Sequence, residues 1–261
     1  MVRGALGGGS SPRSARRYRG FMGTKRSAYA DVLRALPPAE IPAYLDAHSH
    51  LPGPRGNLEL IDAASDVLPR ELALELAAAA GEFLACCGVA TLGRLALDDP
   101  DDPRPDELLT HYAGDARWRV REAAAMAGQR IGDADPVRLR RLVERWTASS
   151  DPLVVRCGIA TVCEPRLLRD PRTATAALAA CGRATQQLVG LPPERRRQAD
   201  VRTLRQALGY CWSVAIAADP APGLRAFGAL DTTDPDVAWV ICENRRKRRL
   251  AVLLAAGEPA S

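Results

Sequence analysis

Hydrophobic residues recur along the chain with helical spacing, and short polar or Pro- and Gly-containing breaks separate the periodic segments. Apolar positions three and four residues apart lie on one face of a helix, so this spacing predicts amphipathic helices. From residue 57 onward the breaks predict helices over 57–67, 69–80, 82–97, 105–113, 116–131, 136–148, 152–168, 171–188, 200–218, 221–229 and 235–255. Two shorter helices are expected before them, over 27–36 and 39–48. Strand signals are lacking, and we therefore expect an all-α protein.

The composition agrees with closely packed helices. Hydrophobic residues make up 47% of the 261 residues but aromatic residues only 5%, so Ala, Leu and Val must supply most of the core. Ala and Leu are strong helix formers. A chain of this length can bury a substantial core, either as one large domain or as one continuous array of repeats.

A repeat appears when the breaks are aligned. An Asp precedes a helix that opens with Val in Asp115-Ala-Arg-Trp-Arg-Val-Arg, Asp151-Pro-Leu-Val-Val-Arg and Asp234-Pro-Asp-Val-Ala-Trp. Arg121 and Arg156 lie 35 residues apart in the first two copies, and the third copy lacks the Arg. The pattern resembles the HEAT repeat, in which Asp caps a helix, Val enters the core and Arg points along the inner face. We predict a HEAT-like, armadillo-type α-solenoid over residues 27–261, a right-handed superhelix of antiparallel helix pairs.

The net charge of +5 belongs to the N-terminal segment. Residues 1–26 hold seven basic residues and no acidic one, which leaves 29 basic against 31 acidic residues in the remainder. This Gly-, Ser- and Arg-rich segment has no periodicity and is predicted to be a disordered tail. A translation start at Met22 instead of Met1 would delete most of it. Residues 27–112 hold 5 basic and 15 acidic residues, and residues 113–261 hold 24 and 16. A polyanion-binding surface and an Arg-rich solvated face both agree with this asymmetry.

The sequence argues against disulfide, zinc and nucleotide sites and against a membrane or exported location. The seven cysteines lie in apolar runs without metal-ligand spacing, which argues against a disulfide framework and a structural zinc site. No nucleotide-binding glycine motif is present, and we predict neither a cofactor nor a metal. Neither a transmembrane run nor the apolar region of a signal peptide appears. We expect a cytoplasmic protein without a membrane partner.

Residues 117–132 carry the main candidate chemistry. At about 100° per residue, one stripe of this predicted helix contains Val120, Ala124, Ala127 and Ile131. Trp118 and Glu122 fall on the opposite side, and their spacing of four makes them neighbours on that surface. Arginines at 117, 119 and 121 flank them. An indole beside a carboxylate on this face indicates either a binding surface or a second packing contact.

Over residues 56–250 the chain resembles bacterial HEAT-repeat proteins of unassigned activity. The matching blocks are Arg-Trp-Arg-Val-Arg-Glu at 117–122, Cys-Glu-Pro-Arg-Leu-Leu at 163–168, Gly-Tyr-Cys-Trp-Ser-Val at 209–214 and Glu-Asn-Arg-Arg-Lys-Arg-Arg-Leu at 243–250. More distantly, residues 115–218 resemble the HEAT-like alkylpurine DNA glycosylases of the DNA alkylation repair family. The site of that family is a Trp four residues before an Asp, an Arg about one repeat later and a second Trp further on.

In this resemblance Trp118 is the first Trp, Arg156 is the Arg and Trp212 is the second Trp. Glu122 stands where the family has Asp, which keeps a carboxylate but moves its oxygens by about one methylene. A misplacement of about 1 Å can cost about 100-fold in rate. The resemblance implies a protein that cradles duplex DNA on its concave face and hydrolyses the N-glycosidic bond of alkylated purines. Glu122 and Trp118 would be catalytic, and the residues that would bind DNA are Arg156, Trp212, Arg119 and Arg121.

Other interpretations stay open at this point. The chain can be a non-enzymatic scaffold that binds a protein partner on its concave face, or a DNA-binding solenoid that recognises damage without cleaving. Trp118 and Trp212 can be packing residues, and Glu122 can simply pair with a neighbouring arginine. The basic runs at 195–197 and 245–249 are each either solvated surface or phosphate contacts.

Overall fold

Most helices begin at an N-cap side chain or a proline that the sequence supplies. The computed structural model describes residues 25–257. Asn57 accepts a hydrogen bond from the backbone N–H of Leu60 and starts α3, as predicted. Asp151 and Asp234 cap α9 and α14 in the same way. A proline follows each of these two aspartates at the first helical position. The N–H of that position has no partner within a helix, so proline costs no helical hydrogen bond there.

Helices account for all regular structure in the described part of the chain. A helix over 25–35 is followed by η1 (Pro38–Glu40), α2 (Ile41–Ala47), α3 (Leu58–Val67), α4 (Arg70–Ala77), α5 (Glu82–Asp98), α6 (Arg104–Ala113) and α7 (Trp118–Ala134). The second half contains α8 (Pro136–Thr147), α9 (Pro152–Val162), η2 (Leu167–Arg169), α10 (Pro171–Gly190), α11 (Pro193–Arg196), α12 (Ala199–Ala218), α13 (Pro220–Gly228), α14 (Pro235–Arg245) and α15 (Arg248–Gly257). Residues 25–257 contain no strand, which confirms the all-α class.

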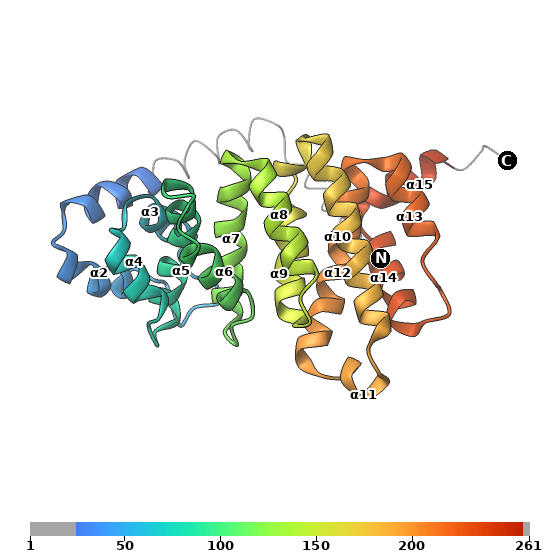
Figure 1. Cartoon of the computed structure of the whole chain (residues 1–261), viewed down its shortest axis with the longest axis horizontal. Coiled ribbons are helices and arrows are strands. Elements are labelled where there is room, and N and C mark those ends of the chain that lie inside the picture. The colour runs from blue at the N-terminus through green and yellow to red at the C-terminus, as the bar shows by residue number, and fades with distance from the viewer. Residues whose placement is uncertain (1–24, 258–261) are drawn as a thin grey trace, which may run out of the picture.

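The helices follow one another along the long axis of the molecule (Figure 1). α4 packs on α5, α6 on α7 and α8 on α9, while α5, α7, α9, α12 and α14 form a series in which each helix packs on the next. Elements that are close in sequence are therefore neighbours in space, from the blue end of the ribbon to the red end (Figure 1). This arrangement is compatible with the predicted α-solenoid. Among the described helices, none is long and apolar enough to cross a membrane.

Small and aliphatic side chains fill the space between the helices in two clusters. The first runs from Ala30 to Cys157 and the second from Leu139 to Leu250, so the two overlap at α8 and α9. Trp146 lies in the core, and its Nε1 donates to Oγ1 of Thr110 at 2.9 Å. Ala, Leu and Val dominate both clusters, in agreement with the composition.

Two predicted helices are interrupted. The helix predicted over 152–168 ends at Val162, because Pro165 disfavours helical backbone at the residue before it. The helix predicted over 235–255 is divided into α14 and α15 by a turn at 246–247, although the sequence offers no Pro or Gly there. This second interruption places the basic run 245–249 at a turn between two helices.

The predicted boundary of the N-terminal tail at residue 26 is also too late. Residues 25 and 26 already belong to the first described helix. Arg26 donates to both carboxylate oxygens of Asp66 on α3, at 2.8 Å and 2.7 Å, so it is tied to the helical body. The remainder of the predicted tail, residues 1–24, lies outside the described residues.

Candidate functional site

The loop before α7 is fixed by an aspartate and an arginine. Asp115 accepts hydrogen bonds from the backbone N–H of Arg117 at 2.7 Å and from its Nε and Nη2 at 3.0 Å and 2.8 Å. Nη1 of Arg117 donates to the carbonyl of Ala79, at 2.9 Å, in the loop before α5. The predicted N-cap role of Asp115 is wrong, because Arg117 occupies that position and Asp115 forms the turn before it. The start of α7, and with it Trp118, is thereby fixed against the preceding helix pair.

The two faces of α7 separate as the sequence predicts. The buried face contains Val120, Ala124, Ala127 and Ile131. Trp118 is the first residue of the helix and is 52% exposed. Glu122 follows one turn later with 41% of its side chain exposed. The indole and the carboxylate therefore share the open face of the helix, and neither is sealed in the core.

Arg119 covers one face of the Trp118 ring and is itself held by a carboxylate. Its guanidinium carbon lies 4.5 Å from the centroid of the indole ring. Nη1 donates to Glu82 of α5 at 2.9 Å, and Nη2 donates to the carbonyl of Gly53 at 3.3 Å. Arg119 therefore forms part of the wall of the site. Because Glu82 balances its charge, Arg119 is poorly suited to bind the phosphate that was predicted for it.

Glu122 and Arg156 form an ion pair between equivalent positions of neighbouring helices. Nη2 of Arg156 donates to Oε1 of Glu122. Glu122 is the fifth residue of α7 and Arg156 the fifth residue of α9, and the two helices pack on each other. Only 18% of the Arg156 side chain is exposed. Arg156 therefore stands behind the carboxylate and orients it.

The positions at which α7 and α9 begin correct the predicted alignment of the repeats. The sequence pattern aligns Arg121 with Arg156, whereas the structure aligns Glu122 with Arg156, at a separation of 34 residues. The reason is that Asp151 is itself the N-cap of α9, while the cap of α7 lies two residues beyond Asp115. The Asp residues of the two copies therefore differ in structural role.

Trp118 and Glu122 line an open cleft of about 680 Å³. Its floor is apolar and consists of Ile61 from α3 together with Phe83 and Cys86 from α5, all of them buried. Further lining residues include Arg55, Leu58, Glu59, Met126 and Gln129. A cleft of this size with an apolar floor and a few polar groups at its edge is typical of a binding site for a small organic group.

The charges of the cleft balance each other. Arg55 and Arg119 are matched by Glu59 and Glu122 among the lining residues. Burial, reinforced by the nearby carboxylate of Glu82, raises the pKa of Cys86 to about 12, so its thiol stays protonated at neutral pH. The floor therefore offers neither a thiolate nucleophile nor a net charge that would attract phosphate.

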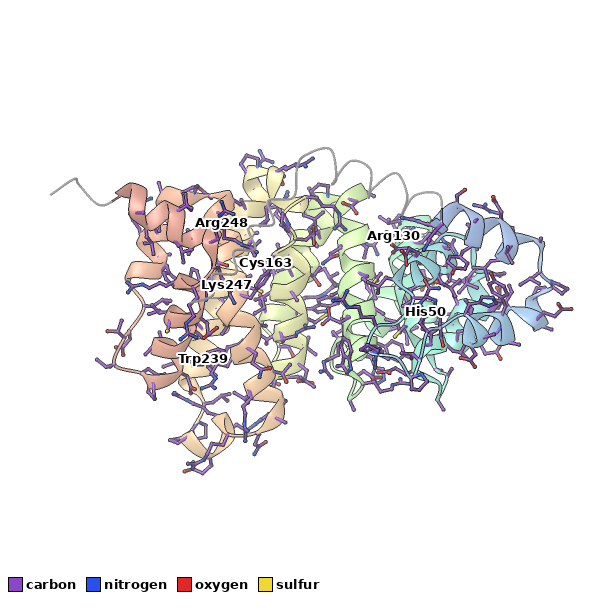
Figure 2. The ribbon with its side chains drawn as sticks, turned by 180° about the vertical axis from the view of Figure 1, so that it is seen from behind. His50, Arg130, Cys163, Trp239, Lys247 and Arg248 are labelled. Atoms are coloured by element: carbon purple, nitrogen blue, oxygen red, sulfur yellow. The ribbon has the colours of Figure 1, made fainter. Side chains whose placement is uncertain are left out.

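A polar cleft of about 640 Å³ continues the first one along α7. Met126 and Gln129 line both clefts. The second cleft contains Arg130, which Figure 2 labels, and several further arginines. Carboxylates hold all four of its arginines: Arg26 and Arg130 pair with Asp66, Arg94 pairs with Asp98, and Arg166 pairs with Asp133. Paired charges thus follow the whole exposed side of α7.

Arg121, predicted to bind DNA, is buried. It is 8% exposed, and its Nη1 donates to the carbonyls of Asp115 and Ala116 at 2.6 Å and 3.0 Å. Burial and the nearby positive charge of Arg156 lower the pKa of Arg121. The prediction is wrong for this residue, because its guanidinium closes the loop before its own helix and cannot reach a ligand.

Trp212, the predicted second tryptophan of the site, belongs to the core. It is 1% exposed, its Nε1 donates to Oγ1 of Thr185 at 3.1 Å, and its ring lies 5.6 Å from that of Phe227. It lies on α12, which packs on α9. Trp212 therefore cannot stack on a bound base, and the core alternative that the sequence left open holds.

The floor and the far wall of the cleft come from residues that the sequence did not single out. Ile61, Phe83 and Cys86 read as ordinary core positions, and Leu58 as the first residue of a helix. The hydrogen bond from Arg119 to the carbonyl of Gly53 joins residues 66 positions apart, and no local sequence pattern predicts it. Only the fixed packing of α3 and α7 on α5 brings these residues together.

No family model, curated protein or solved structure matches the chain. The HEAT-repeat and glycosylase resemblances therefore stay predictions.

Proposed function

We propose that the chain is an α-solenoid that binds duplex DNA and acts in the repair of alkylated bases. The observation that carries the proposal is the cleft beside α7, where an exposed indole and a carboxylate lie over an apolar floor. A purine turned out of the duplex is a flat apolar ring, and alkylation at a ring nitrogen gives it a positive charge. Trp118 offers a flat π surface to such a ring, and Glu122 offers the opposite charge.

Glu122 would assist hydrolysis of the N-glycosidic bond. As the bond from the base to C1′ breaks, its electron pair goes to the cationic base, which departs neutral. Water then adds to C1′ and gives up a proton. A carboxylate beside C1′ can accept that proton and stabilise the positive charge on the sugar. Arg156, which faces Glu122 from α9, would act as a positioning residue.

The balanced charges of the cleft support a cationic base over a phosphate as its ligand. A phosphate would need unpaired cations, whereas Arg119 is paired with Glu82 and Arg156 with Glu122. A cationic ring needs an indole and an accessible carboxylate. Arg156 holds Oε1 of Glu122, but 41% of the Glu122 side chain stays exposed, against 18% for Arg156, so the carboxylate is the more accessible partner of this ion pair. The phosphates of the duplex would accordingly be bound outside the cleft.

Release of free alkylated purine from methylated duplex DNA tests this function. We expect the wild-type chain to release base and Glu122→Gln to release it about 100-fold more slowly or worse, the typical cost of losing a general base. Glu59→Gln is the matched control, because it removes one negative charge from the same cleft without removing the proposed base, and it should slow release far less than Glu122→Gln. No release by the wild type would exclude the glycosylase, and equal loss in both variants would make the effect purely electrostatic.

A second function, a scaffold for a protein partner, is favoured by two exposed apolar side chains. Leu58 and Trp118 are 53% and 52% exposed beside the buried floor of the cleft. Apolar side chains grouped in this way can anchor a partner protein. Two results together would favour the scaffold. The wild-type chain would not bind DNA, and its binding to a partner protein would be lost with Leu58→Ser and kept with Glu122→Gln.

A further inference from the structure

Five consecutive basic residues, Arg245 to Arg249, lie at the turn between α14 and α15. A continuous helix would spread these side chains around its axis, at about 100° per residue. The turn at 246–247 brings them to the junction of two helices instead. Figure 2 labels Lys247 and Arg248 close together in the C-terminal half of the molecule. We refer to residues 245–249 as the basic turn.

A buried amide anchors the basic turn to α12. Asn244 is fully buried, and its Nδ2 donates to the carbonyls of Leu208 and Val240, each at 2.8 Å. Its Oδ1 accepts from the backbone N–H of Ser213 on α12, also at 2.8 Å. A buried amide with both ends satisfied fixes the geometry of the residues beside it. The charges that follow are therefore carried on a rigid support.

The same helix, α12, supplies an aromatic side chain to the basic turn. Tyr210 is 45% exposed, and its hydroxyl accepts a hydrogen bond from Nη2 of Arg249 at 3.0 Å. The Arg249 guanidinium carbon lies 4.8 Å from the centroid of the tyrosine ring. The sequence blocks at 209–214 and 243–250, which the cleft does not use, thus meet in one place and form a surface of cations around an aromatic ring.

Among residues 25–257, most charges of the basic turn have no carboxylate partner. Within the described residues, only Arg246 forms an ion pair, with Glu243 at 2.6 Å. The other basic run of the chain differs, since Arg195, Arg196 and Arg197 are paired with Asp200, Asp234 and Glu194. The two runs look alike in sequence, but the structure neutralises one and leaves the other open. Adjacent like charges repel, so an unpaired group of this kind is suited to an anionic ligand.

We infer that the basic turn is a binding surface for the phosphate backbone of nucleic acid. The inference deepens the proposed function and rests on it for the choice of duplex DNA as the ligand. Four cations of the basic turn have no carboxylate partner in the described part of the chain, and such a group matches a linear array of phosphates. The exposed ring of Tyr210 adds a surface on which a sugar or an unpaired base can lie. The cleft beside α7 would then receive the base, and the basic turn would hold the backbone without regard to sequence.

The salt dependence of binding to undamaged duplex DNA tests the inference. Arg245→Gln/Arg248→Gln removes two exposed, unpaired charges, and Arg141→Gln/Arg225→Gln removes two exposed arginines from α8 and α13 as the matched control. Anisotropy titrations over a range of salt give the slope of log K against log salt. Each lost phosphate contact should make this slope shallower by about 1, so we expect a change of about 1 to 2 in the first variant and none in the control.

Further outcomes separate this inference from the proposed function. Equal slopes for both variants would overturn the inference that the basic turn binds phosphate. If base is still released, the proposed glycosylase activity would be unaffected by that result. Binding of RNA but not of duplex DNA, lost with the basic turn, would support the surface and exclude DNA repair. A wild-type chain that binds neither nucleic acid would overturn the inference. Circular dichroism of each variant checks that the fold is kept.

Discussion

Gly93 of α5 lies directly against the backbone of Ala127 on α7. A Cβ atom added at Gly93 would come within 2.8 Å of the Cα of Ala127, a separation that real Cβ atoms essentially never show. The two helices that carry the floor and the wall of the cleft therefore approach each other backbone to backbone. The absence of a side chain at this one position decides how closely α5 and α7 pack.

Gly93→Ala is accordingly expected to destabilise the protein by about 1 to 3 kcal/mol, the usual cost of overpacking a core. The added methyl group meets backbone, which cannot rotate away. Gly182→Ala is the matched control, since Gly182 is also inside a helix and a Cβ there meets nothing within 4 Å. The control should raise stability by about 0.4 to 1 kcal/mol through the smaller entropy of its unfolded chain. Urea denaturation measures both, and equal effects would contradict the close approach.

The two tryptophans of the predicted site should respond oppositely to truncation. Trp212→Ala removes a fully buried ring and is expected to cost about 3 to 5 kcal/mol of stability. Trp118→Ala removes an exposed ring and should change stability by no more than about 0.5 kcal/mol. Denaturation followed by circular dichroism is suitable, because it does not depend on the fluorophore that is removed. A large loss with Trp118→Ala would mean that this indole packs in the core.

Arg121 and Arg141 give a comparison of buried and exposed arginines. Arg121→Ala leaves the carbonyls of Asp115 and Ala116 without their charged donor and should cost about 1.5 to 3 kcal/mol. Arg141 is exposed on α8, and Arg141→Ala should remain within about 0.5 kcal/mol of the wild type. Thermal unfolding of the two variants side by side provides the measurement. Similar stabilities would show that the loop before α7 does not depend on Arg121.

The fold was largely predictable because its signals are local. Asn57, Asp151 and Asp234 lie next to the backbone groups that they cap, and the stripe of α7 follows from helical periodicity alone. The turn at 246–247 could not be predicted in this way. No residue there breaks a helix, and its position is set by the tertiary anchor of Asn244 on α12.

The site was predictable only where one helix carries it. Trp118 and Glu122 are four residues apart, so helical geometry makes them neighbours whatever the rest of the chain does. Whether an arginine binds a ligand or only stabilises the fold depends instead on a carboxylate or carbonyl far away in the sequence. Arg119 meets Glu82 and Arg156 meets Glu122 only because successive helices stack in register. A single sequence contains no local record of those pairs.

The carboxylate of Asp115 should make the stability of the fold sensitive to acid. Hydrogen bonds from the Arg117 side chain, only partly opposed by burial, lower the pKa of Asp115. A carboxyl whose pKa is lower in the folded chain stabilises the fold above its unfolded pKa of about 3.9, and this contribution is lost as the pH falls through the folded value. Asp115→Asn should therefore be less stable than the wild type near neutral pH, and the difference should shrink below about pH 4.

Stability measured by urea denaturation from about pH 3 to pH 7 checks this pH dependence, and Arg117→Gln identifies its cause. That variant removes the guanidinium that binds both oxygens of Asp115 and keeps the backbone donor of Arg117. It should lose most of the same acid-sensitive contribution. If Arg117→Gln kept the full pH dependence, the backbone hydrogen bond alone would be responsible. If Asp115→Asn had the same pH profile as the wild type, the ion pair would contribute nothing to the pH dependence of stability.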